Sequence, residues 1–234
     1  MNKTLDRCDL LITGGQVIDG TGCPAITADV AVQGDRIIAV GDLTVEKADA
    51  VIDAQGKVIT PGFIDVHTHD DRLLLSNSEV TPKLSQGVTT VVVGNCGVSL
   101  SPWLSDRAPP PPLDLVFPDG KNGAHFSTFH SYSTELARRP AAINALPLIG
   151  HSTLRCGAMD RLDRPATQAE IEQMRTLLRE SLAAGAGGFS TGLFYPPNKA
   201  APAAEVEALA RELSAFQGVY ATHMRNEGDQ LFES

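Results

Sequence analysis

The chain has 234 residues, of which 42% are hydrophobic, and a formal net charge of -9 at pH 7. This length suits one large or two small domains with a real apolar core, and the composition excludes a mainly disordered chain. The acidic balance argues against nucleic acid and against an anionic membrane surface as partners, because both require a basic footprint. The N-terminal apolar run is too short for a secretory signal or a membrane span, so we expect a cytoplasmic protein.

The four cysteines are Cys8, Cys23, Cys96 and Cys156, and no two of them form a C-x-x-C pair. In a cytoplasmic chain of this size, cysteines are expected to be free thiols rather than disulfides. Cys96 differs from the others because it follows a predicted buried strand.

The first part of the chain predicts a small all-β domain, which we place at residues 1–58. Short strands separated by glycine turns are expected in segments 9–19 and 28–41, and a further one begins at residue 50. Gly34 and Asp35 lie between two apolar runs, which is typical of a β-hairpin.

A histidine pair follows this domain in the segment VITPGFIDVHTHDD, residues 58–71. Successive side chains of a strand point to opposite faces, so His67 and His69 share one face and can aim at one point. Two imidazoles in this arrangement can bind one metal ion. By itself the spacing also fits two exposed histidines at a strand end.

From residue 59 onward, strand and helix patterns alternate, which predicts a parallel sheet. Four strands are expected to follow the His-x-His strand, at residues 88–95, 141–151, 186–193 and 219–225. Helices are expected at residues 77–87, 126–138, 167–185, where Thr167 and Glu170 predict a capping box, and from 202 to 218. The proline-rich stretch at 108–113 predicts an exposed loop without an assigned function.

Five strands leave two architectures open, an open doubly wound sheet and a barrel. A closed (β/α)8 barrel needs eight such units and typically about 250 residues. The end of the chain soon after the fifth strand favours a barrel that is truncated after about five strands.

Polar side chains gather at the predicted carboxyl ends of the strands, where parallel α/β sheets bind their ligands. His67 and His69 follow the first strand, Cys96 follows the second, and His223 lies on the fifth. Two imidazoles, a thiolate and a third imidazole form a ligand set suited to zinc. Another strand-end histidine, His151, is a reserve candidate.

The chain resembles a known family at several of these motifs. The run Pro-Gly-Phe-Ile-Asp-x-His-x-His after a small β unit resembles the amidohydrolase superfamily, metal-dependent hydrolases on a (β/α)8 barrel. The segments at residues 94–99, 150–155, 185–195 and 222–227 resemble those of the N-acyl-D-amino-acid deacylases, or D-aminoacylases. The resemblance implies an α/β fold with a small N-terminal β-sandwich-like domain and an amidohydrolase barrel, of which residues 59–234 are the N-terminal half.

The resemblance also implies roles for residues of this sequence. Cys96 and His223 would hold a tightly bound zinc, and His67 and His69 would serve a second, weaker position. Tyr195 would lie near the acyl group of an N-acyl-D-amino acid, and hydrolysis of its linear amide bond would release a D-amino acid and a carboxylate.

Two further expectations concern the substrate and the rest of the barrel. Arg225, just past His223, would steer an anionic substrate or form a structural ion pair. The general-base aspartate of the family is expected beyond Ser234, so no catalytic residue is assigned within this chain. The chain looks like an N-terminal fragment that is inactive alone and pairs with a C-terminal half or a homo-oligomer partner.

Two other functions remain open at this point. One is a cyclic-amide amidohydrolase of the hydantoinase or dihydroorotase kind, or an isoaspartyl dipeptidase relative. Hydantoinases and dihydroorotases usually bridge two metals with a carboxylated lysine on the fourth strand, and segment 186–193 contains no lysine. The other is a barrel fragment that binds metal without catalysis.

Overall fold

The computed structural model describes residues 3–76, 79–117 and 125–233. The chain forms two compact units, Met1–Gly62 and Phe63–Ser234. We describe each unit by itself. In the described parts of the chain, no helix combines the length and the apolar character that crossing a membrane requires.

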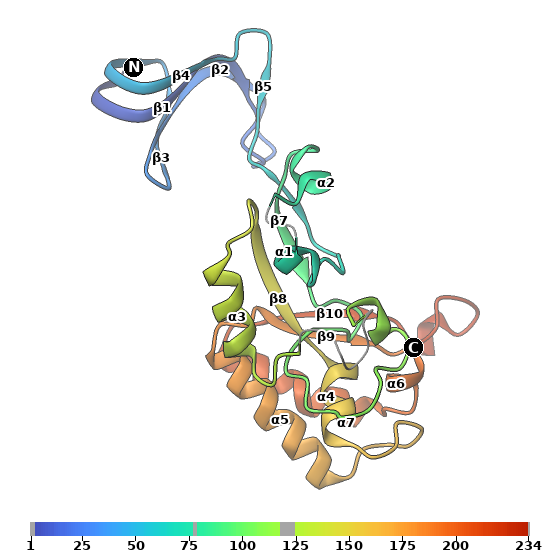
Figure 1. Ribbon diagram of the computed structural model, residues 1–234. Helices are drawn as coiled ribbons and strands as arrows, with labels where there is room; N and C mark the ends of the chain where they lie inside the picture. Colours follow the sequence, from blue (N-terminus) through green and yellow to red (C-terminus); the bar gives the residue numbers. More distant parts are fainter. Residues whose placement is uncertain (1–2, 77–78, 118–124, 234) are drawn as a thin grey trace. The chain divides into compact units, whose positions relative to one another are not determined.

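The first unit contains one described β-sheet (Figure 1). Its strands are β1 (Lys3–Val17), β2 (Ile26–Gln33), β3 (Arg36–Gly41), β4 (Leu43–Asp53) and β5 (Val58–Ile59). They lie in the order β3-β2-β1-β4, and β5 pairs with the end of β1. A second layer that would make this unit a sandwich remains a prediction.

Strand pairing in this unit confirms the hairpin and corrects two strand boundaries. The β2 and β3 strands are antiparallel and turn at Gly34, whose φ of +58° suits glycine. The β1 strand begins at Lys3 rather than at residue 9, and β4 begins at Leu43 rather than at residue 50, because the two strands pair in parallel from Lys3 opposite Leu43 onward. Such a non-local pairing leaves no local periodicity in the sequence.

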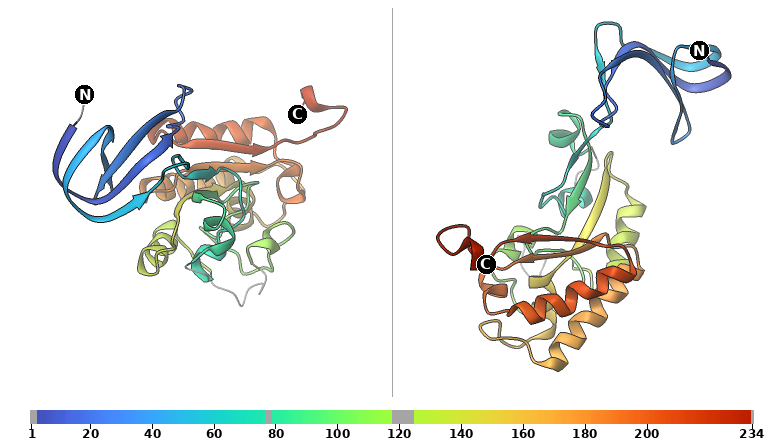
Figure 2. Two further views of the ribbon diagram at one scale, coloured as in Figure 1. Left: turned by 90° about the horizontal axis from the view of Figure 1, so that it is seen from above. Right: turned by 180° about the vertical axis from the view of Figure 1, so that it is seen from behind.

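The second unit is organised around a curled, fully parallel sheet, as in one half of a barrel (Figures 1 and 2). Among the described residues, its order is β10-β9-β8-β7-β6, which confirms the predicted succession of five parallel strands. The strands are β6 (Phe63–Asp65), β7 (Val88–Val93), β8 (Asn144–Gly150), β9 (Gly188–Gly192) and β10 (Val219–His223).

Helices connect these strands. They are α1 (Leu73–Ser76), α2 (Thr81–Leu84), α3 (Phe129–Arg138), α4 (His151–Ala158), α5 (Gln168–Ala183), α6 (Pro196–Lys199) and α7 (Ala203–Ala210). The rear view in Figure 2 shows α5 and α7 side by side along one face of the sheet. The main apolar core lies between these helices and the strands, with Phe189 of β9, Leu178 of α5 and Leu209 of α7 fully buried in it.

Two helix predictions differ from the structure, and the helix α4 was missed. The helix expected at 77–87 is limited to α2. The buried Val80 before it has the left-handed conformation (φ 44°), which an α-helix cannot contain. Residues 77–78 lie outside the described residues. The helix expected at 202–218 ends at Ala210 and tightens into a 3₁₀ turn. The α4 helix was not predicted, because it starts directly at the last residue expected in the β8 strand and is short.

The capping box of α5 is confirmed. The Thr167 hydroxyl accepts from the Glu170 backbone N–H, and the Glu170 carboxylate accepts from the Thr167 backbone N–H. We expect Thr167→Ala to lower the free energy of unfolding by about 1 kcal/mol, because a helix N–H loses its partner. Urea unfolding measures this, with Gln173→Ala on the exposed face of α5 as the control. An unchanged midpoint for Thr167→Ala would contradict the cap.

Candidate metal centre

The predicted ligands lie where the strands of the curled sheet end. His67 and His69 follow β6, Cys96 follows β7, and His223 is the last residue of β10. The β6 and β10 strands form the two edges of the described sheet, and β7 lies next to β6. Because the sheet curls, residues at the carboxyl ends of both edge strands approach one another.

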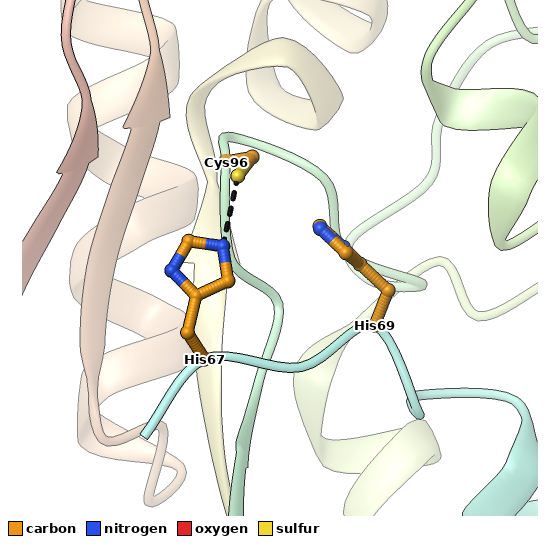
Figure 3. A group of neighbouring side chains, drawn as sticks. All are labelled: His67, His69 and Cys96. Atoms are coloured by element: carbon orange, nitrogen blue, oxygen red, sulfur yellow. Dashed lines mark hydrogen bonds between the residues drawn. The ribbon is translucent and has the colours of Figure 1, made fainter. Parts of the chain in front are cut away.

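Three of the four side chains form one compact group. The ligand atoms of His67, His69 and Cys96 all lie within 4.8 Å of one another. The Nε2 atom of His67 is 3.1 Å from the Cys96 sulfur, and both imidazoles rise from one segment toward the thiol (Figure 3). His223 lies beside this group, with Nδ1 3.9 Å from the Cys96 sulfur.

Burial and charge shape the protonation of these groups. Burial lowers the pKa of His69, and the neighbouring His67 lowers it further, so the neutral imidazole that binds metals is favoured. Burial also raises the pKa of the Cys96 thiol, and Glu227 adds to this effect. A bound cation opposes both effects on the thiol, because it stabilises the thiolate.

The donor set fits a borderline-soft divalent ion. Within the described residues, the buried Nδ1 atom of His69 has no hydrogen-bond partner, which is costly unless another group engages it. Imidazole nitrogens and a thiolate are the ligands that zinc prefers. The site is therefore chemically suited to zinc.

Close backbone packing fixes the loop that carries Cys96. A Cβ on Gly192 would lie 2.2 Å from the Cys96 carbonyl oxygen, and a Cβ on Gly94 would lie 2.1 Å from the Leu148 carbonyl oxygen. Glycine is thus required where this loop touches β8 and β9. Cys96 itself has a φ of +54°, an uncommon conformation for a residue with a side chain.

The two residues predicted to bind substrate have different surroundings. The Tyr195 hydroxyl is 3.4 Å from Nδ1 of His223, and the two rings pack with centroids 4.9 Å apart. The Arg225 guanidinium donates to the carbonyls of Lys199 and Ala201, each at 2.8 Å. Tyr195 therefore borders the candidate metal centre, whereas Arg225 ties the end of α6 to the segment after β10.

Among the residues that the structure describes, the remaining histidines are not part of the compact ligand group. His125 stacks on Trp103, and His130 lies on α3. His151 is fully buried and contacts Glu205, with 3.0 Å between Nε2 and Oε1. The reserve candidate His151 is thus engaged in a different polar group.

Sequence reasoning missed two polar clusters, one beside the segment that carries both histidines and one that joins α4, α6 and α7. Lys83 of α2 lies 2.6 Å from Asp65 and 3.2 Å from Asp70, so it ties together the two ends of the segment that carries both histidines. The buried Arg155 of α4 contacts Glu205 of α7 and donates to the Pro197 carbonyl of α6 at 2.7 Å. The partners in each cluster are distant in sequence, so no local pattern predicted these contacts. The only signal was that Arg155 ends the segment Gly-His-Ser-Thr-Leu-Arg, which resembles the deacylase family.

Known proteins share both the sequence and the structure. The amidohydrolase family model matches residues 50–233. A D-aminoacylase of Alcaligenes xylosoxydans xylosoxydans is 51% identical over 95% of this chain and 46% of its own length. An N-acyl-D-aspartate deacylase of the same organism is 50% identical over 98% of this chain and 46% of its own length. The chain thus spans about half the length of these relatives.

Solved structures give the same result. A D-aminoacylase crystal structure superposes with a TM-score of 0.91 at 50% identity, covering 97% of this chain and 47% of that one. The N-acyl-D-glutamate deacylase of Bordetella bronchiseptica, solved with zinc and a phosphonate mimic of the tetrahedral intermediate, superposes with a TM-score of 0.87 at 42% identity, with coverage of 97% and 47%. The family model covers nearly four fifths of this chain, and the chain therefore belongs to the amidohydrolase family.

Proposed function

We propose that this protein is a zinc-dependent hydrolase that cleaves the linear amide bond of N-acyl-D-amino acids. The observation that carries the proposal is the Cys96 thiol beside the His67 imidazole at the end of β7. It occurs in a chain about half identical to a D-aminoacylase and an N-acyl-D-aspartate deacylase. We also propose that the small β domain comprises residues 1–58 and the barrel domain residues 59–234.

Each residue of the centre has a task in this proposal. Cys96 and His223 hold the tightly bound zinc, and His67 and His69 hold a second, weaker position. Zinc, when bound, polarises the amide carbonyl and lowers the pKa of water. Tyr195 packs against the His223 ring, so it can orient that ring and contact the acyl group of the substrate.

A chimera tests the activity. Residues 1–234 would replace the aligned part of the D-aminoacylase that is 51% identical, so that the relative supplies the remainder of its own length. We expect the zinc-loaded chimera to release D-amino acids from N-acetyl-D-amino acids and to leave the L-isomers intact, because this half would provide the metal ligands.

The controls separate activity from metal binding. Residues 1–234 alone should bind zinc without turnover, because the proposed metal ligands lie in this chain whereas no general base is assigned within it. A folded, zinc-loaded chimera that hydrolyses hydantoins or dihydroorotate and spares N-acyl-D-amino acids would contradict the proposal. Turnover by residues 1–234 alone of about 1 s⁻¹ or more would contradict the need for the part of the relative that this chain does not cover.

A further inference from the structure

The Cys96 loop, defined as residues Gly94–Gly97, has a conformation that local sequence does not favour. Gly94, Cys96 and Gly97 all have positive φ, and Cys96 is the one with a side chain. The loop is fully or nearly fully buried, so water cannot supply the hydrogen bonds that its backbone groups need. Other parts of the protein must therefore hold the sulfur in place.

One hydroxyl group closes this loop. The Ser190 Oγ atom of β9 donates to the Gly94 carbonyl at 2.5 Å and accepts from the Gly97 backbone N–H at 3.0 Å. Its two partners are the first and last residues of the Cys96 loop. Ser190 is fully buried, so no water can replace its hydroxyl without rearrangement.

The outer sides of the same two residues are held by other elements. The Gly94 N–H donates to the buried Asp71 carboxylate at 3.1 Å, and the Gly97 carbonyl accepts from the Ser152 N–H at 2.9 Å. These bonds attach the loop to the segment after His69 and to the start of α4. Within the backbone, the Val98 N–H donates to the Asn95 carbonyl at 2.9 Å. Among the side chains that the structure describes, Ser190 is the one whose printed hydrogen bonds join Gly94 to Gly97 across the base of Cys96.

We infer that Ser190 is a positioning residue, whose hydroxyl fixes the Cys96 loop so that the thiolate points at the metal. Its hydroxyl bonds to backbone atoms on either side of Cys96, and it acts on the thiolate through them. Hydrogen bonds that orient metal ligands typically contribute a factor of 10–100 to metal affinity. The inference rests on the proposed function, because it requires Cys96 to be a ligand.

The test uses residues 1–234 with Co²⁺ and Zn²⁺ as probes. In the parent protein, Co²⁺ should give a thiolate-to-metal charge-transfer absorption, which reports the bond to sulfur. Ser190→Ala should weaken zinc binding by about 10- to 100-fold and reduce this absorption band at saturating Co²⁺. Ser181→Ala is the matched control, since Ser181 is a buried serine on α5 whose hydroxyl donates to the Leu177 carbonyl.

A pair of isosteric variants guards against simple misfolding. Ser190→Thr keeps the hydroxyl. Ser190→Val has the shape of threonine, with a methyl group in place of the hydroxyl. If Ser190→Ala does not fold, as judged by circular dichroism, we expect Ser190→Thr to bind zinc at least about tenfold more tightly than Ser190→Val. Equal affinities in this pair would overturn the inference.

The outcomes separate this inference from the proposed function. If the parent binds Co²⁺ without a charge-transfer band, Cys96 is not a ligand and the proposed metal centre itself fails. If the parent shows the band, and Ser190→Ala keeps both the band and the zinc affinity of the parent, only the role of Ser190 is refuted. Loss of affinity in Ser190→Ala but not in Ser181→Ala would support it.

Discussion

Cys96→Ala is expected to weaken zinc binding to residues 1–234 by more than about 100-fold, beyond the effect typical of an outer hydrogen-bonding partner. The reason is that the thiolate is the charged member of the ligand set, and the remaining members are neutral imidazoles. Equilibrium competition with a chelating dye measures the affinity, and metal analysis after dialysis measures the zinc that stays bound. In the chimera with the D-aminoacylase relative, the same substitution should abolish turnover.

Two other cysteines serve as controls for that substitution. Cys8 is buried in the β-sheet of the first unit, and Cys23 is exposed in the loop between β1 and β2. Cys8→Ala and Cys23→Ala should leave zinc content and activity nearly unchanged. Zinc content in Cys96→Ala equal to that of these two controls would refute the assignment of Cys96 as a ligand.

Glu205→Leu is expected to destabilise the second unit by about 3–5 kcal/mol, because it leaves the Arg155 guanidinium buried without its counter-charge. Both side chains are fully buried, and Glu205 also accepts from the Ala166 backbone N–H at 3.0 Å and contacts His151. Denaturant unfolding measures the loss. The exposed pair Arg161–Asp163 provides the control, since Arg161→Met should leave the unfolding midpoint unchanged.

A double substitution tests whether the two charges act as a pair. Arg155→Met/Glu205→Leu should cost less than the sum of the two single substitutions, because neither charge is then left buried alone. Additive costs would show that Arg155 stabilises the fold through the Pro197, Leu162 and Arg164 carbonyls rather than through Glu205.

The same pair predicts acid sensitivity. Burial by itself raises the pKa of Glu205, but hydrogen bonds from His151 and Arg155 outweigh it and lower this pKa to about 2. An unfolded glutamate titrates near 4.3, so the unfolded state binds the proton first. The stability from ionised Glu205 is therefore present above about pH 4.3 and is lost as the pH falls toward 2. Glu205→Leu should flatten the stability profile in that window.

Local patterns were sufficient for most of the fold. The alternation of strand and helix patterns predicted the five parallel strands. The β-branched run at residues 88–95 also indicated a strand buried in a parallel sheet. Thr167 with Glu170 predicted the start of α5 by a mechanism confined to four residues. Features that depend on contacts between distant segments were not predictable, and the extension of β1 to Lys3 by pairing with β4 is one of them.

The candidate site also has a part that local patterns predicted and a part that depends on contacts between distant segments. His67 and Cys96 could be expected to meet, because both follow parallel strands whose carboxyl ends share one edge of the sheet. No pattern indicated that Ser190 would bridge the Cys96 loop, since a serine in a strand is unremarkable until its partners are known. Arg155 and Glu205 lie 50 residues apart, and their burial as a pair becomes evident only from the contact of their side chains in the folded protein.

The X-ray absorption spectrum at the zinc edge tests the metal centre most directly, using zinc-loaded residues 1–234 and their Cys96→Ala variant. The metal centre proposed here predicts one sulfur neighbour at about 2.3 Å and nitrogen neighbours at about 2.0 Å in the parent, with the sulfur contribution absent from the variant. A parent spectrum with only nitrogen and oxygen neighbours, or a sulfur contribution that persists in Cys96→Ala, would contradict it.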